Sequence, residues 1–235
     1  MQLTPALVQA GVTRGIPDRA PRILPTGFAD LDACLPNHGW PQGALVTLQP
    51  AVSGIGELQL LMPALARLSQ EARYLVWVAP PHRLSAPMLV AHRIALERVL
   101  TVRPQTHKEA LWSAYQALSS VSVGAVMCWF SAIRHSEFRA LARAAAQGGQ
   151  LGFCFLPPVM SAQVARLRLV LRPVPQGLRI DVDGQSRHAP VVIADIHRKA
   201  SVLCRAGAWR RGSPEARPSV VVGPLRPEGD VRIFP

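Results

Sequence analysis

The sequence has few of the residues that build metal or redox sites. Its four cysteines lie far apart and form no CxxC pair, so we expect neither a zinc cluster nor a redox motif, and most should be buried and reduced. The histidines show no ligand spacing such as HExxH, and no serine or cysteine has an evident base partner. The sequence therefore predicts no metal, no cofactor and no catalytic residue.

Long apolar runs are also missing. No stretch reaches the roughly 18 apolar residues that a membrane helix needs. Met1 to Ala10 carry no basic region followed by an apolar run, so they do not have the pattern of a signal peptide. We expect a cytoplasmic protein without a membrane partner.

Lysine is scarce, with Lys108 and Lys199 alone, whereas arginine is abundant. The chain has 26 Lys+Arg against 14 Asp+Glu and a formal net charge of +12. Arginine binds phosphates and carboxylates through its planar fork of donors, so nucleic acid or an acidic protein surface is the expected partner. The alternative is a solvated basic face without any partner.

A chain of 235 residues, 49% of them hydrophobic, can bury one full core. We expect a loosely ordered arm at 1–22, a core domain at 23–200 and a basic tail at 201–235. Within the core, short apolar strands alternate with amphipathic helices, which is typical of a mostly parallel sheet with helices on both faces. From Ala165 on, arginines alternate with leucines, which predicts antiparallel strands at one sheet edge.

The predicted strands and caps follow from local patterns. Thr26 and Ser136 are each placed to cap a helix, Thr106 and Glu109 form a T-x-x-E capping box, and Gly148 with Gly149 ends a helix. The predicted strands are Ala44–Leu48, Tyr74–Ala79, Val123–Phe130, Leu151–Leu156, Leu178–Val182 and Val191–Ile196.

One segment resembles a known fold. L-P-T-G-F-A-D-L-D-A-C-L, from Leu24 to Leu35, followed by H-G-W-P-Q-G-A-L-V-T-L, is similar to the entry into the RecA recombinase fold. The next residues, Q-P-A-V-S-G-I-G, fall where a RecA-like protein carries its phosphate loop. The resemblance therefore implies a RecA-like α/β fold.

The chemistry of that loop is absent. A working phosphate loop needs glycines, a lysine and a Ser/Thr hydroxyl. Here Gln49 stands at the first glycine, Ser53 and Gly54 follow, Ile55 replaces the lysine and Gly56 replaces the hydroxyl. By the same comparison, uncharged residues replace the water-activating carboxylate, the metal-supporting aspartate and the sensor pair: Pro81, Trp129, Leu156 and Pro157. We therefore predict that the chain is not an enzyme.

The stretches S-G-I-G-E-L-Q-L-L-M-P-A-L, Y-L-V-W-V-A-P-P, G-A-V-M-C-W-F-S and L-G-F-C-F-L-P-P also resemble the SulA cell-division inhibitors, and still more the ImuA family of translesion-synthesis accessory proteins. The ImuA likeness covers nearly the whole chain. It implies an accessory role in SOS-induced translesion DNA synthesis, with an ImuB-type Y-family-like protein, an error-prone replicative polymerase subunit and the RecA recombinase as partners. The alternative is a SulA-like inhibitor that binds the tubulin-like division protein.

Arginines supply the candidate binding residues for DNA or a protein partner. Arg134, Arg139 and Arg143 follow a predicted strand, although Arg139 and Arg143 are equally consistent with the solvated face of a helix. In the tail, basic residues lie beside an aromatic ring, which suits DNA or an acidic groove: Arg205, Trp209, Arg210, Arg211 and Arg217. Self-association is a further expectation, because RecA-like domains commonly stack edge to edge.

Two positions at the edge of the predicted sheet have open interpretations. Trp129 is either a stacking platform for a base or a ring that fills the vacated nucleotide site. The loop from Val52 to Gly56 either holds a phosphate weakly or is a retained structural turn, and Glu57, which we expect at the first helical position, would repel an anion.

Overall fold

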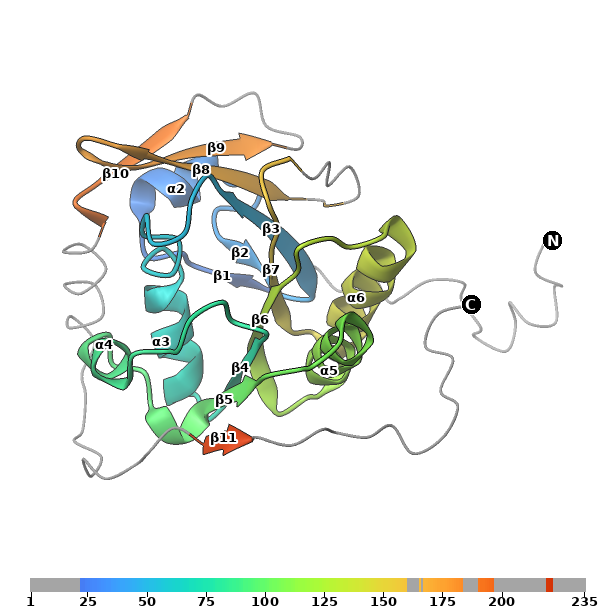
Figure 1. Cartoon of the computed structure of the whole chain (residues 1–235). Coiled ribbons are helices and arrows are strands. Elements are labelled where there is room, and N and C mark those ends of the chain that lie inside the picture. Colours follow the sequence, from blue (N-terminus) through green and yellow to red (C-terminus); the bar gives the residue numbers. More distant parts are fainter. Residues whose placement is uncertain (1–21, 160–164, 166, 184–189, 197–218, 222–235) are drawn as a thin grey trace, which may run out of the picture.

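A nine-stranded sheet organises the computed structural model, which describes residues 22–159, 165, 167–183, 190–196 and 219–221 (Figure 1). Its strands in the described residues are β3 (Ala44–Pro50), β4 (Tyr74–Val78), β5 (Val99–Val102), β6 (Val123–Trp129), β7 (Leu151–Phe155), β8 (Arg168–Val174), β9 (Gly177–Asp183), β10 (Val191–Ala194) and β11 (Ser219–Val221). Their spatial order is β10-β9-β8-β3-β7-β6-β4-β5-β11. A separate antiparallel pair joins β1 (Ile23–Leu24) and β2 (Trp40–Pro41).

The sheet is parallel from β8 to β11, and β9 and β10 extend it in antiparallel pairing at one edge. The predicted architecture, a mostly parallel sheet with antiparallel strands at one edge, is confirmed. Because parallel strands all end at the same edge, the loops after β3, β4, β5, β6 and β7 gather there. This carboxyl-terminal edge of the sheet is where the candidate site lies.

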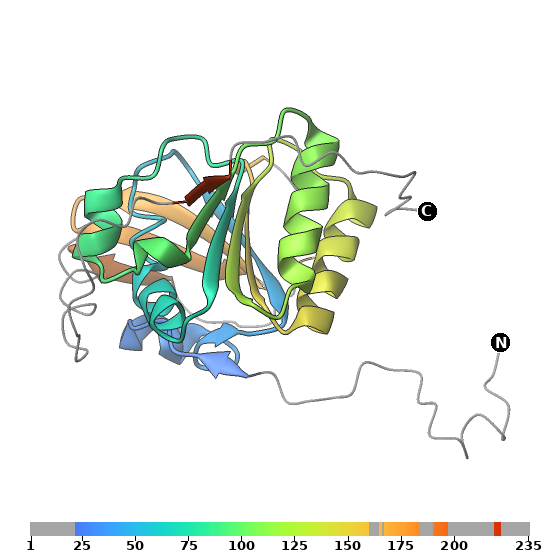
Figure 2. The ribbon, with the colours of Figure 1, turned by 90° about the horizontal axis from the view of Figure 1, so that it is seen from below.

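Helices cover both faces of the sheet, and Figure 2 shows α5 and α6 together on one face with α3 on the other. The helices in the described residues are α2 (Ala29–Cys34), α3 (Met62–Gln70), α4 (Ala86–Ala91), α5 (His107–Ser119) and α6 (His135–Gly148), with a short 3-10 turn at Leu96–Arg98. Leu31, Leu65 and Leu68 pack on the α3 face, whereas Leu111 and Leu141 pack on the α5–α6 face. This is the expected result of sheet strands that are apolar on both sides.

Two of the predicted caps are confirmed. Thr106 precedes α5, where its hydroxyl accepts the N–H of Glu109 at 3.2 Å while the Glu109 carboxylate accepts the N–H of Gln105 at 2.8 Å. Gly149 ends α6 in the left-handed conformation, at φ 72°. The local sequence alone was sufficient for both, because capping groups lie within four residues of the N–H they bind.

The other two caps were predicted at the wrong residues. Helix α2 begins after Phe28, and the Thr26 hydroxyl instead accepts the N–H of Phe28 at 3.0 Å in the preceding turn. Helix α6 begins after Arg134, so Ser136 lies inside its first turn. The carboxylate of Glu137 takes the capping role, since it accepts the Arg134 N–H at 2.8 Å.

Strand β5 was not predicted, because its four residues, three apolar and one threonine, follow a charged turn and carry no period that separates strand from helix. The segment 201–235, predicted as a tail, contributes β11, whose three residues pair in parallel with β5. Of the predicted arm, only residue 22 is among the described residues. None of the described helices has the length and the hydropathy that crossing a membrane requires.

Candidate functional site

The loop after β3 keeps the backbone bend of a phosphate loop without its chemistry. Gly54 and Gly56 have φ values of 86° and 104°, in the left-handed region that favours glycine. A Cβ on Gly56 would lie 2.8 Å from Cγ2 of Ile196, so a hydroxyl-bearing residue does not fit there without movement. Ser53 is exposed, and Ile55 is half-buried against the core on the α3 face.

A carboxylate of the chain itself occupies this loop. Oε1 of Glu57 accepts the N–H of Gly54 at 2.9 Å. The prediction that Glu57 stands at the first helical position was wrong, since α3 begins at Met62. The negative charge lies directly against the loop and opposes an incoming phosphate, so the geometry favours the interpretation of a retained structural turn.

Gln49 fixes the loop to the neighbouring strand end. Its side chain is buried and its Nε2 donates to the carbonyl oxygen of Pro157 at 3.0 Å. Gln49 closes β3, Pro157 follows β7, and the two strands are neighbours in the sheet. A side chain therefore fills the position at which a phosphate loop carries its first glycine.

Three stacked aromatic rings lie at the ends of β4, β6 and β7. The Trp129 ring lies 4.3 Å from Phe155 at an interplanar angle of 6°, and 5.9 Å from Trp77 at 14°. Strand β6 runs between β7 and β4, so Trp129 is stacked between the two other rings. Because both faces of Trp129 are in use, it offers no platform for a base, and the interpretation of a space-filling ring is supported.

The remaining substituted positions at this edge also carry no reactive group. Pro81 is exposed in the loop after β4, and Leu156 is buried after β7. Within the described residues, no group of three His, Cys, Asp or Glu side chains comes together as a metal site. The ionisable group that the structure places on the loop is Glu57, and its carboxylate is bound to the Gly54 N–H.

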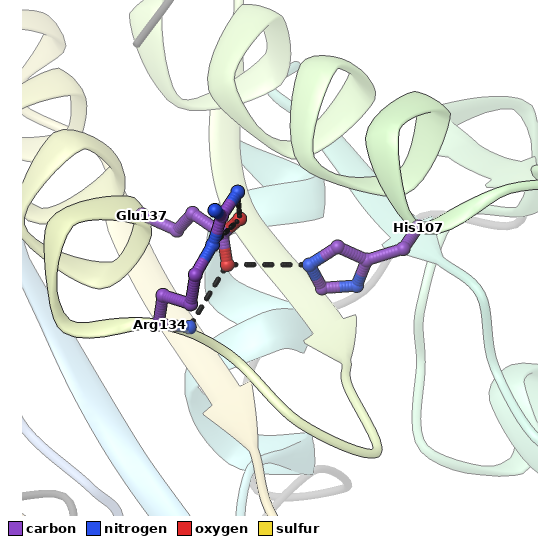
Figure 3. Close-up of polar contacts among 3 residues, drawn as sticks. All are labelled: His107, Arg134 and Glu137. Atoms are coloured by element: carbon purple, nitrogen blue, oxygen red, sulfur yellow. Dashed lines mark hydrogen bonds and ion pairs between the residues drawn. The ribbon is translucent and has the colours of Figure 1, made fainter. Parts of the chain in front are cut away.

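A polar cluster that sequence reasoning missed joins the starts of α5 and α6 (Figure 3). The Glu137 side chain is only 1% exposed. Its carboxylate accepts the N–H and the Nε–H of Arg134, at 2.8 and 2.7 Å, and lies 3.2 Å from Nε2 of His107. His107 also packs edge-on against Phe130, with ring centroids 5.7 Å apart. The R-x-x-E spacing was a signal for the cap, but nothing local pointed to His107.

Burial raises the pKa of Glu137, but the hydrogen bonds from Arg134 and His107 together with the charge of Arg134 outweigh it, so the pKa lies below its ordinary value. The same hydrogen bond and charge raise the pKa of the Arg134 guanidinium. Both shifts favour the ionised pair. We infer that Arg134 orders the loop after β6 and the start of α6.

The other predicted arginines divide into two groups. Arg139 and Arg143 are exposed on α6, four residues apart and therefore on one side of the helix. Arg205, Trp209, Arg210, Arg211 and Arg217 lie outside the described residues. Binding of DNA or of a partner by either group stays a prediction.

Comparison with known proteins points to one family. The family model described as "Cell division inhibitor SulA" matches residues 49–152, which run from the degenerate loop to the start of β7. The chain is 30% identical over 114 residues to the cell division inhibitor SulA of Cronobacter sakazakii, covering 48% of this chain and 68% of that protein. It is 27% identical over 108 residues to SulA of Photorhabdus laumondii, covering 46% of this chain and 61% of that protein.

A third relative, SulA of Edwardsiella piscicida, is 31% identical over 101 residues, which are 43% of this chain and 60% of the relative. The chain thus spans about three fifths of the length of the curated relatives that it matches. The crystal structure of SulA from Pseudomonas aeruginosa aligns at a TM-score of 0.40 with 28% identity, over 47% of this chain and 97% of that chain. The predicted likeness to SulA is confirmed, and the likeness to ImuA stays a prediction.

Proposed function

Because the chain belongs to the SulA family of cell division inhibitors, we propose that it acts by binding a partner protein, without catalysis, and that residues 49–152 inhibit the tubulin-like division protein. The family takes its name from inhibition and not from a reaction, in agreement with the prediction that the chain is not an enzyme.

The observation that carries this proposal is the filled nucleotide position. At the ends of β3, β4, β6 and β7, where a RecA-like ATPase binds its nucleotide, this chain has the Glu57 carboxylate on the loop and the ring of Trp129 between two others. Here the sheet and helices of the fold are kept, but packed side chains replace the reactive groups. A protein of this kind acts by binding partners at its surface.

The proposal is tested by its effect on cell division and on the division protein. Expression of the chain in growing bacteria should give filamentous cells, and the purified chain should bind the tubulin-like division protein and slow its polymerisation. Gly56→Val is a matched negative control, since its Cβ would lie 2.8 Å from Ile196 and strain the loop within the matched segment. Normal cell length with soluble wild-type chain, together with no binding, would contradict the proposal.

A second candidate function is the accessory role in translesion synthesis. It is favoured by the residues beyond the family match, where β8, β9, β10 and β11 follow residue 152. The ImuA likeness includes this part of the chain, and the arginines there suit DNA or acidic partners. Its partners would be an ImuB-type protein, an error-prone replicative polymerase subunit and the RecA recombinase, with DNA as a further ligand and self-association as a further property.

Two measurements distinguish the candidates. Capture of an ImuB-type protein by the full chain, with loss of ultraviolet-induced mutation when the gene is deleted, would favour the translesion role. Filamentation without either effect would favour division inhibition. The cytoplasmic location stays a prediction for both.

A further inference from the structure

We propose that the loops after β4, β5 and β6 form a docking surface for an acidic segment of the partner protein. The inference rests on the proposed mode of action, partner binding, and specifies the chemistry of that partner. We call this surface the basic edge and define it by six exposed residues: His82, Arg83, Arg103, Lys108, Arg134 and His135.

The three loops form one continuous surface. Strands β6, β4 and β5 are neighbours in the sheet, so their carboxyl ends lie side by side, roughly 5 Å from strand to strand. The N–H of Ala79, after β4, donates to the carbonyl oxygen of Val102 at the end of β5 at 2.9 Å. His107, at the start of α5, contacts Glu137 of α6 (Figure 3). Its ring also packs against Phe130 after β6, so it joins the loops after β5 and β6.

Arg134 is paired with Glu137, but in the described part of the chain the other three Lys and Arg side chains of this edge have no acid beside them. Among the residues that the structure describes, Arg83, Arg103 and Lys108 have no ion-pair partner. The two carboxylates of these loops are bound within the protein: Glu109 accepts the N–H of Gln105, and Glu137 is buried against Arg134. The surface therefore shows positive charge outward while its negative groups hold the loops together.

This arrangement differs from that of the arginines on β8 and β9. On the open face of β8 and β9, Arg168 pairs with Asp183, and Arg172 and Arg179 both pair with Asp181. Their charge is largely neutralised by neighbours on the same sheet. Compared with the arginines on β8 and β9, the basic edge has positive charge that is not paired within the protein and can bind a partner. It also lies where ligands of α/β folds bind.

A protein segment fits this edge better than a single-stranded nucleic acid does. Sequence-tolerant binding of single strands relies on exposed aromatic rings that stack on bases. The Phe and Trp rings at this edge are packed: Phe130 and Phe155 are buried, and Trp129 is stacked on both faces. The edge offers guanidinium groups and the exposed ring of Pro81, which suit carboxylates and small apolar side chains.

The experiment compares two double charge reversals in the full chain. Arg83→Glu with Arg103→Glu alters the basic edge, whereas Arg22→Glu with Arg67→Glu makes the same charge change before β1 and on α3, outside the basic edge. All four side chains are exposed, so both variants should fold, which circular dichroism checks. Binding is measured with the tubulin-like division protein and, independently, with a fluorescent peptide of alternating glutamate and alanine.

The edge variant should bind both probes at least about 10-fold more weakly than wild type, and the control variant within about 2-fold, since tenfold in affinity corresponds to about 1.4 kcal/mol. Binding of wild type should weaken as salt rises. If wild type binds the acidic peptide but not the division protein, only the division-inhibitor proposal fails.

Two results would overturn the basic edge. One is equal binding of the acidic peptide by wild type and the edge variant. The other is loss of a fluorescent single-stranded oligonucleotide by the edge variant with unchanged binding of the acidic peptide, which would assign these arginines to nucleic acid.

Discussion

Glu137 illustrates what a single side chain contributes in this protein. Its carboxylate is buried, accepts two hydrogen bonds from Arg134 and lies 3.2 Å from His107. It therefore joins the start of α5 to the start of α6. Glu57 has the corresponding position in the degenerate loop, where it accepts the Gly54 N–H. In both places a carboxylate accepts a backbone N–H and holds the backbone in place.

Replacing Glu137 by glutamine should change how stability depends on pH. The folded pKa of Glu137 is lowered, so its contribution is fully present above the ordinary carboxyl value, near 4.3, and is lost as pH falls toward the folded value. Glu137→Gln should lower the free energy of unfolding by about 2 kcal/mol at pH 7. Urea unfolding at pH 7 and at pH 3 measures both effects.

The loss caused by Glu137→Gln should shrink at the acid end, because wild type then loses the same interaction. Glu97→Gln is the control, since Glu97 is exposed in the turn before β5. A loss of equal size at both pH values would contradict the assignment of the ionised carboxylate.

Among the helices and strands, the N-termini of α5 and α6 show when local sequence predicts where a helix begins and when it does not. Thr106 caps α5 as predicted, whereas Ser136, which has an equally good capping side chain, lies within the first turn of α6. The difference comes from packing, because Glu137 reaches back to Arg134 and contacts His107. The start of α6 is thus fixed by the interface with α5 and not by the best capping residue.

This difference can be measured with two matched alanine variants. Thr106→Ala should lower the free energy of unfolding by about 1 kcal/mol, which is typical of a lost cap. Ser136→Ala should change it by less than about 0.5 kcal/mol, as exposed substitutions do. Denaturant midpoints at constant slope report both. A loss at Ser136 as large as that at Thr106 would show that Ser136 caps α6 after all.

At the scale of the molecule, the sheet sets which groups meet. The parallel order brings the ends of β3, β7, β6 and β4 together, so four substituted loops become one edge with packed rings at its centre. Strand β11 comes from the other end of the sequence and covers the outer side of β5. Pairing of this kind protects an edge strand from association with other chains.

Because packed side chains fill the nucleotide position at this edge, we expect that nucleotide does not raise the melting temperature of the protein. A ligand present at 100 times its dissociation constant would stabilise the fold by about 2.7 kcal/mol. For a domain of this size that would raise the melting temperature by several degrees, at roughly 2 to 4 °C per kcal/mol. We expect a shift below about 1 °C with millimolar Mg-ATP. A larger shift, absent when Mg²⁺ is chelated, would show that the loop still binds nucleotide.

The fold class, the strands β3, β4, β6 and β7 to within two residues, and the loss of the phosphate loop at Gln49, Ile55 and Gly56 were all predictable from the sequence. Periodicity and residue identity are local properties, so they can be read without coordinates. Four residues were too few to reveal β5 in this way, although Arg103, which follows it, belongs to the basic edge.

The contacts between distant side chains, in contrast, follow from the tertiary structure. Trp129 stacks between Trp77 and Phe155, which are brought together by the strand order and not by sequence spacing. Glu137 meets a histidine 30 residues away, and the Gln49 side chain meets Pro157, 108 residues away. Burial and pairing of this kind depend on how the sheet and its helices close around each side chain, which no local pattern specifies.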